Sequence, residues 1–401
     1  MNYIILSKYS VVTFGNNGSL LYDINNKVFY SLDIDHTNIL KQIKKGTQID
    51  EIRKKFDNNL VSDFITKLLN NNLASLSDTF YVEEEFRTGN AMASTNLDFT
   101  TCYIEFPTDC NEGCTNCKEP KIFSCLACCK PDNISQQIDV SFYENLLKDL
   151  LKTSVNLLVF HGGDPLTNYY EVLEIIKYTR NKADQKVKII LKTNGSLINE
   201  EISMFLIKYK INPLINFNNM NEQDFEGRIK KLKTHLTEFN HNNLDYYCNI
   251  VFESPSLNYN NHCVDKLKSL GFKNITISYT IDLKENLQQY ASVNFPQKLV
   301  YNFNFYKELH PCLNGTLAIT SDKKVIPCPA LKQSELLDLS KDNFINVFNS
   351  QDKISELWRL TLQKIDKCKS CKFKYSCSDC RAIEEILSNQ HLKKEICYLG
   401  F

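Results

Sequence analysis

The chain has 401 residues, of which 43% are hydrophobic and 23% are charged, as in an ordinary globular protein with room for two or three domains. Lysine plus arginine and aspartate plus glutamate both number 47, which argues against a nucleic-acid binder because such proteins usually carry a basic excess. The sequence has neither an apolar run of the roughly 18 residues that cross a bilayer nor an N-terminal secretion signal, so we expect a cytoplasmic protein that binds no membrane.

The first 80 residues are predicted to form a domain of their own. Two short strands at 20–23 and 27–32, joined by an asparagine-containing turn, precede three stretches with helical periodicity. These stretches cover residues 36–45, 48–56 and 60–72. A hairpin followed by three helices predicts a winged-helix-like domain over residues 1–80, with helix N-caps expected at Asp50 and Ser62.

The charge of this domain opposes the DNA-binding role that its predicted shape suggests. Residues 1–80 hold nine lysines and arginines against eight aspartates and glutamates, so no basic face is expected. Residues 81–97 are polar and lack periodicity, which predicts a linker.

Strand-like and helix-like segments alternate over residues 98–300. The strand-like segments cover 100–106, 156–161, 187–192, 213–217, 246–252 and 274–280. The helix-like segments between them cover 140–153, 169–182, 200–209, 222–236 and 262–271. This alternation predicts an α/β domain with a parallel sheet, either an open sheet or a partial (β/α)6 barrel, with ligands at the carboxyl ends of the strands.

The sixteen cysteines are clustered, and without an export signal such clusters indicate metal or redox chemistry rather than disulfides. Three of them, Cys102, Cys248 and Cys263, stand alone and are expected to be small buried hydrophobic residues.

The first cysteine cluster follows the first strand of the alternating domain. Cys110, Cys114 and Cys117 can bring three thiolates onto one turn, which suits an iron–sulfur cluster with one iron left free. A zinc site made by Cys114, Cys117, Cys125 and Cys128 has acceptable spacing and is the alternative. The sequence assigns no role to Cys125, Cys128 and Cys129.

This spacing after a first strand resembles the cluster loop of the radical S-adenosylmethionine (radical SAM) enzymes. The resemblance extends to the next two strands, which end in "HGGDP" and "KTNG". It implies that the cluster binds at Cys110, Cys114 and Cys117 and that S-adenosylmethionine contacts Gly162, Gly163, Asp164, Pro165, Thr193, Asn194 and Gly195. The glycines would let the backbone approach the cofactor. At two positions the sequence differs from the family's pattern. Asp164 stands where the family has glutamate, and Asn116 stands where it has an aromatic residue.

The C-terminal cysteines resemble the SPASM domain, the extension that carries auxiliary clusters in peptide-modifying radical SAM enzymes, and "CKFKYSCSDCRA" is similar to the grasp-with-SPASM peptide maturases. The resemblance implies a SPASM domain over residues 305–401 with two auxiliary [4Fe-4S] clusters. One would be bound by Cys368, Cys371, Cys377 and Cys397. The other would be bound by Cys312, Cys328 and Cys380. Its fourth iron would either have an open site or be bound by His310, a carboxylate or water. Zinc binding by Cys368, Cys371, Cys377 and Cys380 stays an alternative, and Lys323 stands where this domain usually has glycine.

The same resemblance implies a function. Residues 1–80 would recognise the leader of a ribosomally made precursor peptide by strand addition. A flavodoxin- or ferredoxin-type donor would reduce the cluster, and the 5′-deoxyadenosyl radical would abstract a hydrogen from the peptide. The open iron favours a thioether cross-link. The alternatives are a radical SAM maturase of a folded protein, of the sulfatase or quinoprotein type, and a non-catalytic zinc-binding protein.

Overall fold

The structure is a computed structural model, and it describes most of the chain. The described residues are 2–84, 98–114, 125–127, 130–135, 137–184, 186–218, 221–252, 257–272, 274–280, 303–377, 379–390 and 392–397. Most of the predicted linker and three cysteines, Cys117, Cys128 and Cys129, lie outside these residues. Within them, no helix is long and apolar enough to cross a membrane.

The N-terminal part contains the predicted hairpin and three helices, together with three strands that the sequence analysis missed. A sheet of β2 (Ser10–Gly15), β3 (Gly18–Asp23) and β4 (Val28–Leu32) precedes α1 (Ile34–Lys44), α2 (Ile49–Lys55) and α3 (Asn58–Asn70), and β1 (Tyr3–Leu6) pairs with β5 (Ala74–Ser77). The expected N-caps were wrong. Asp33 and Asp57 cap α1 and α3 through their side chains, because each accepts a backbone N–H of the first turn.

The middle of the chain contains the six predicted strands as a parallel array. They are β6 (Thr101–Glu105), β7 (Leu157–His161), β8 (Lys188–Thr193), β9 (Ile211–Asn218), β10 (Tyr247–Phe252) and β11 (Asn274–Tyr279). The connecting helices are α4 (Val140–Leu150), the 3₁₀ turn η2 (Pro165–Asn168), α5 (Tyr169–Lys182), α6 (Glu200–Lys208), α7 (Glu222–His241) and α8 (Leu257–Ser269).

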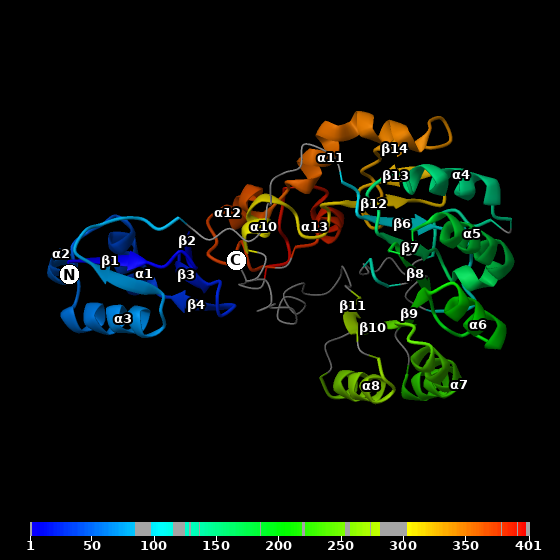
Figure 1. The fold of residues 1–401 in the computed structure, drawn as a ribbon, viewed down its shortest axis with the longest axis horizontal. Coiled ribbons are helices and arrows are strands. Elements are labelled where there is room, and N and C mark those ends of the chain that lie inside the picture. The colour runs from blue at the N-terminus through cyan, green and yellow to red at the C-terminus, as the bar shows by residue number, and fades with distance from the viewer. Residues whose placement is uncertain are drawn as a thin grey trace.

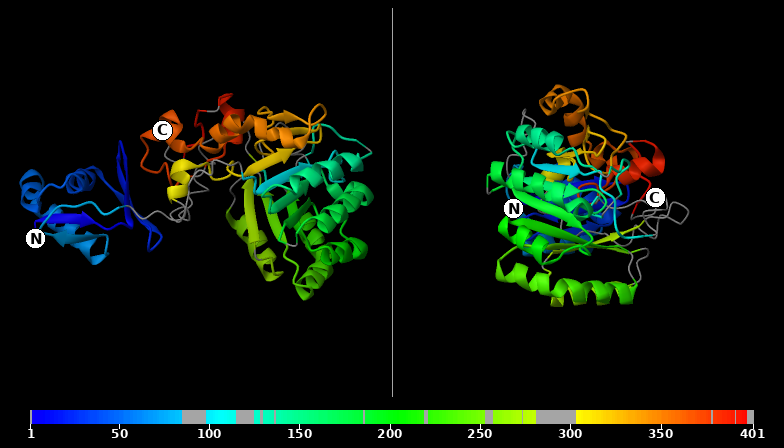
Figure 2. Two further views of the ribbon diagram at one scale, coloured as in Figure 1. Left: turned by 45° about the horizontal axis from the view of Figure 1, so that its top comes forward. Right: turned by 90° about the vertical axis from the view of Figure 1, so that its right-hand side faces the viewer.

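The strand order decides between the open sheet and the partial barrel. Each of the six strands pairs with its neighbours in the sequence, from β6 through to β11. Because β-strand–helix–β-strand crossovers are right-handed, an unbroken order places every helix on the same face. Figures 1 and 2 show α4 to α8 along the outer side of a curved sheet. The domain is therefore a partial (β/α)6 barrel.

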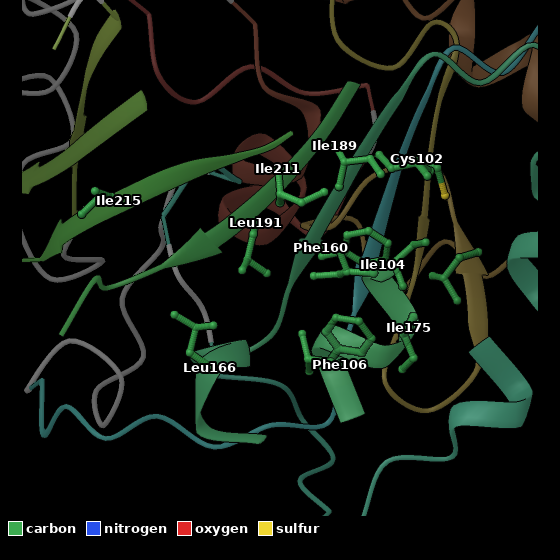
Figure 3. Packing of buried hydrophobic residues seen from close by; sticks show 14 of the residues in the cluster. Cys102, Ile104, Phe106, Phe160, Leu166, Ile175, Ile189, Leu191, Ile211 and Ile215 are labelled. Atoms are coloured by element: carbon green, nitrogen blue, oxygen red, sulfur yellow. The ribbon is translucent and has the colours of Figure 1, made fainter. Parts of the chain in front are cut away.

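Alternate residues of the strands pack against the helices. Cys102 and Ile104 of β6, Phe160 of β7 and Leu191 of β8 belong to one buried cluster with residues of the helices, such as Ile175 of α5; Figure 3 shows this packing. Burying each such side chain contributes about 1.5–3 kcal/mol. The expectation that Cys102, Cys248 and Cys263 are buried is confirmed, since they are 0–1% exposed.

The C-terminal segment extends the barrel sheet. β12 (Thr316–Ile319) pairs parallel with β6, and β13 (Lys324–Ile326) and β14 (Leu337–Asp338) follow in antiparallel order. The remaining elements are α10 (Phe303–Glu308), η4 (Phe344–Ser350), α11 (Gln351–Trp358), η5 (Leu362–Lys364), α12 (Asp366–Lys369) and α13 (Arg381–Ser388). Lys323, at the expected glycine position, has a φ of 64°, which is the left-handed region that glycine adopts most easily.

The N-terminal sheet contacts the C-terminal cysteine loop. Tyr22 of β3 donates a hydrogen bond to Ser376 at 3.1 Å, and Lys372 donates to Ser31 of β4 at 2.9 Å. Phe29 packs on Phe373 with ring centroids 6.4 Å apart. In Figure 1, α10, α12 and α13 accordingly lie between the N-terminal part and the barrel.

This contact yields a test of the arrangement. A Cβ atom on Gly15 would lie 2.5 Å from the backbone nitrogen of Lys372, so Gly15→Ala should push the two parts apart at a cost of about 1–3 kcal/mol. We expect faster proteolysis between residues 85 and 97 and a lower unfolding midpoint. Gly227→Ala in α7 is the control, since a Cβ there meets nothing within 4 Å. Equal proteolysis of both variants would contradict the contact.

Candidate active site

The concave face of the barrel is unusually polar for a parallel sheet. The strand residues that point away from the helices include Tyr103, His161, Lys192, Asn216 and Asn249, and the last four of these are at most 5% exposed. Buried parallel strands are usually hydrophobic throughout. Polar side chains at alternate positions therefore mark this face as a binding surface rather than as core.

Two polar atoms of this face have no hydrogen-bond partner among the described residues. They are His161 Nε2 and Asn216 Nδ2. Burial lowers the pKa of His161 well below its usual value, and the nearby Lys192 and Lys332 lower it further, so the ring is neutral at pH 7. Unpaired buried polar atoms cost free energy unless a ligand or water meets them. A polar ligand on the concave face would meet both.

The glycines of the "HGGDP" turn bring the cysteine loop against the turn. Gly162 and Gly163 have φ values of 119° and 52°, and a Cβ on either would overlap the backbone of Phe106 or of Thr108 and Asp109. The absence of a Cβ on these glycines lets the loop that leads to Cys110 lie against the turn. Their predicted contact with S-adenosylmethionine stays a prediction.

Asp164 connects the two cofactor motifs that the sequence predicts. Its fully buried carboxylate accepts hydrogen bonds from Thr193 Oγ1 at 2.9 and 3.0 Å, from Asn194 N at 2.8 Å and from Leu166 N at 3.0 Å. Burial raises the pKa of Asp164, and these hydrogen bonds partly offset the rise. The side chain therefore holds "TNG" against "GGDP".

Asn194 then connects "TNG" to the cysteine loop. Its Nδ2 lies 3.6 Å from the sulfur of Cys110 and donates to Asn111 Oδ1 at 2.8 Å. Arg228 of α7 donates to the Asn194 carbonyl at 2.5 Å and pairs with Glu112. The turns after β6, β7 and β8 thus form one hydrogen-bonded unit with the Cys110 sulfur at its surface, and an N–H aimed at that sulfur stabilises a thiolate.

A second part of the cysteine segment lies deeper on the concave face. The Lys192 ammonium donates to the carbonyls of Cys125 and Ala127 at 2.9 and 2.7 Å. Asp132, further along, forms an ion pair with Lys332 at 2.5 Å. Cys125 and Ala127 are therefore linked to β8, and Asp132 is linked to the segment that follows Cys328.

The C-terminal cysteines form two groups. The members of each group are identified by their electrostatic effects on the pKa values of one another. Burial raises the pKa of Cys312, and Cys380, Cys328 and Cys125 raise it further. A second set comprises Cys368, Cys371, Cys377 and Cys397. Burial raises the pKa of Cys377 to about 12. Its cysteine neighbours are Cys368 and Cys371, while Cys371 has Cys397 as a neighbour.

A buried ionic network lies beside these cysteines. Asp379 accepts from Arg381 at 2.5 Å and from Lys394 at 3.1 Å, and Lys394 also contacts Glu384 at 2.8 Å. All four side chains are at most 5% exposed. Glu384 in turn accepts the backbone N–H of Ile396 at 3.3 Å, next to Cys397.

The donor chemistry of these cysteines fits iron–sulfur clusters. No group of three Cys, His, Asp or Glu side chains in the described part of the chain is close enough to hold a single metal ion. Each thiolate of a [4Fe-4S] cluster binds a different iron, so its ligands stand farther apart than the four ligands of one zinc ion. The N–H aimed at the Cys110 sulfur suits a thiolate ligand of such a cluster.

Comparison with known proteins agrees with this site. The 4Fe-4S single cluster domain family matches residues 101–219. The radical SAM cyclopropyl synthase TigE of Paramaledivibacter caminithermalis is 24% identical over 302 residues, which are 68% of this chain and 62% of TigE. The chain thus spans less than two thirds of that relative's length.

Solved structures extend the likeness. The crystal structure of Streptococcus suis SuiB bound to the precursor peptide SuiA has a TM-score of 0.54 at 16% identity and covers 99% of this chain and 100% of SuiB. The structure of anSMEcpe with bound AdoMet has a TM-score of 0.52 at 18% identity and covers 75% of this chain and 90% of its own. The chain has the radical SAM fold.

These comparisons confirm the resemblance to radical SAM enzymes and the α/β class with a partial barrel, and the family match agrees with a 4Fe-4S cluster in the barrel domain. The sequence analysis missed the polar residues of the concave face in this radical SAM fold. The sequence contains a signal that could have identified them, because His161, Lys192 and Asn216 are polar residues in otherwise apolar strands.

Proposed function

We propose that this chain is a radical SAM maturase of a ribosomally made precursor peptide. Cys110, Cys114 and Cys117 would hold the catalytic cluster, and the turns at Gly162–Pro165 and Thr193–Gly195 would border the cofactor. When bound, the cluster and S-adenosylmethionine supply a carbon-centred radical that abstracts hydrogen from unactivated carbon. The protein holds the peptide on the concave face and excludes water.

The observation that supports this proposal best is the hydrogen-bonded unit at the carboxyl ends of β6, β7 and β8. Asp164 joins two turns and Asn194 joins them to the Cys110 sulfur. Parallel-strand folds bind ligands at this edge. His161 Nε2 and Asn216 Nδ2, which have no hydrogen-bond partner within the described ranges, lie on the same concave face and offer polar contacts to the peptide or the cofactor.

The catalytic cysteines are tested by replacement. Cys110→Ala should lower the iron and sulfide bound after anaerobic reconstitution by about one cluster per chain and should abolish the release of 5′-deoxyadenosine, because a cluster needs its thiolates. Cys263→Ala, a buried cysteine of α8, is the matched control. Reductive cleavage of S-adenosylmethionine by the Cys110→Ala protein would refute the assignment, and a wild-type protein that binds zinc without sulfide would favour the zinc-binding alternative.

The N-terminal part is proposed to bind the leader of that peptide. In the sheet of β2, β3 and β4, β4 is an edge strand, and its Val28 and Tyr30 are 42% and 36% exposed. An exposed edge offers backbone hydrogen bonds to an added strand. SuiB, whose crystal structure contains a precursor peptide, aligns with 99% of this chain and so includes this part.

Lysines placed on an edge strand block strand addition. The double variant Val28→Lys/Tyr30→Lys should therefore bind the short peptides encoded beside its gene at least tenfold more weakly in fluorescence anisotropy. Met204→Lys, on an exposed position of α6, should bind as the wild type does. Equal binding by the two variants would exclude β4 as the leader site and would favour a maturase of folded proteins.

The electron donor and the bond formed are further parts of the proposal. An acidic flavodoxin or ferredoxin would suit the lysines around the C-terminal cysteines, of which Lys369 is 62% exposed, because opposite charges steer association. The product is proposed to be a cross-link. The thioether stays a prediction that depends on an open iron in the cluster of Cys312, Cys328 and Cys380.

A further inference from the structure

The ligand set of one auxiliary cluster is incomplete in the sequence interpretation. Cys312, Cys328 and Cys380 provide three thiolates, whereas a [4Fe-4S] cluster has four irons to ligate. Cys125 is close enough to Cys328 and to Cys380 to interact electrostatically with both thiols. Cys125 comes from the barrel, some 190 residues before Cys312 in the sequence.

His310, the obvious alternative ligand, is already engaged. Its Nδ1 accepts the backbone N–H groups of Cys312 and Leu313 at 3.3 and 3.2 Å. Its Nε2 lies 3.4 Å from Asp379 Oδ2 without a hydrogen bond between the two atoms, and the side chain is fully buried. A ring nitrogen that accepts N–H groups cannot also bind iron, and the other nitrogen faces a carboxylate. His310 therefore positions the Cys312 turn.

The chain holds Cys125 beside these thiolates through contacts on both sides. Lys192 of β8 fixes the carbonyls of Cys125 and Ala127. Asp132, which follows Cys125 in the sequence, forms an ion pair with Lys332 in the turn after Cys328. Tyr103 of β6 lies near the same thiols. Burial raises the pKa of Tyr103, and Cys125, Cys312 and Cys328 raise it further.

We propose that Cys125 supplies the fourth thiolate of the auxiliary cluster held by Cys312, Cys328 and Cys380. The inference rests on the proposed function, since it presumes that these cysteines bind a cluster. On binding, the Cys125 thiol releases its proton to solvent and its sulfur bonds to the fourth iron. The cluster then joins the barrel to the C-terminal segment, and no iron is left for a substrate thiolate. That closed site removes the reason for favouring a thioether over a carbon–carbon bond.

The test uses protein in which only the C-terminal clusters form. In a Cys110→Ala/Cys114→Ala background, reconstituted and reduced, the electron paramagnetic resonance spectrum should not change when cyanide is added, because every auxiliary iron has a protein ligand. Adding Cys125→Ala should open one iron, so cyanide should then shift the g values. His310→Ala in the same background should give no cyanide response.

Each other outcome overturns the inference. A cyanide shift in the background protein would show an open iron, and a shift with His310→Ala but not with Cys125→Ala would assign the ligand to His310. Should Cys125→Ala fail to fold, alkylation of wild-type protein by iodoacetamide decides: Cys125 should react at least tenfold less after reconstitution than before, and equal reaction refutes ligation. A background protein without any iron–sulfur signal would instead refute the proposed function.

Discussion

Replacing Asp164 with asparagine should both destabilise the barrel and impair cofactor chemistry. One carboxylate oxygen accepts Leu166 N and the other accepts Asn194 N. An asparagine side chain would therefore present its NH₂ group to a backbone donor in either orientation. Leaving a buried donor unpaired costs about 1–3 kcal/mol, and Asn194 would lose the contact that aims its Nδ2 at Cys110.

The measurements for Asp164→Asn are the urea midpoint of the apoprotein and the rate of 5′-deoxyadenosine release from the reconstituted enzyme. We expect a clear loss in both. Asp149→Asn is the control, because its ion pair with Lys152 is at the surface and such pairs contribute about 0–1 kcal/mol. Asp164→Glu should also be less stable by about 1–3 kcal/mol, since the extra methylene enters a fully buried site. Wild-type stability of Asp164→Asn would show that the carboxylate does not hold the two turns together.

Asp379→Asn should have the largest effect on stability of any replacement in the C-terminal part. Two cations and two anions balance in the buried network of Asp379, Glu384, Arg381 and Lys394. Although burial alone raises the pKa of Asp379, His310, Lys394 and Arg381 bring it well below its usual value, so the group is charged at pH 7. Removing it leaves an unbalanced buried cation at a cost of about 3–5 kcal/mol.

A double-mutant cycle separates charge balance from simple loss of packing. Asp379→Asn/Lys394→Met restores neutrality and should be less destabilised than the sum of the single variants by more than about 0.5 kcal/mol. Asp366→Asn, in an exposed pair with Lys369, is the control and should change the urea midpoint little. Strict additivity of the two replacements would contradict the network. A second readout is iron content, because Glu384 holds the backbone next to Cys397.

Much of the fold could be predicted from the sequence because it depends on local periodicity. The six strands and five helices of residues 98–300 appear in the predicted order, with bounds that differ by a few residues except at α7 and α8. The predictions were wrong where the local sequence allowed more than one interpretation, as at the helix N-caps. Asp50 and Ser62 are acceptable caps by residue type, but α2 and α3 begin earlier, after the N-cap residues Gln48 and Asp57. β1 is too short to stand out.

The sequence by itself determined which residues carry the chemistry: a glycine turn, a Thr-Asn-Gly turn and clustered cysteines whose order and spacing are written in the chain. Only the tertiary structure decided what these groups meet. Gly162 and Gly163 face the loop that leads to Cys110, and Asp164 accepts hydrogen bonds from Thr193 and Asn194. Cys125 lies near Cys312, which is almost 190 residues further along the chain. Spacing constrains neighbours along the chain, whereas contacts between distant segments depend on strand order and on how the sheet curves.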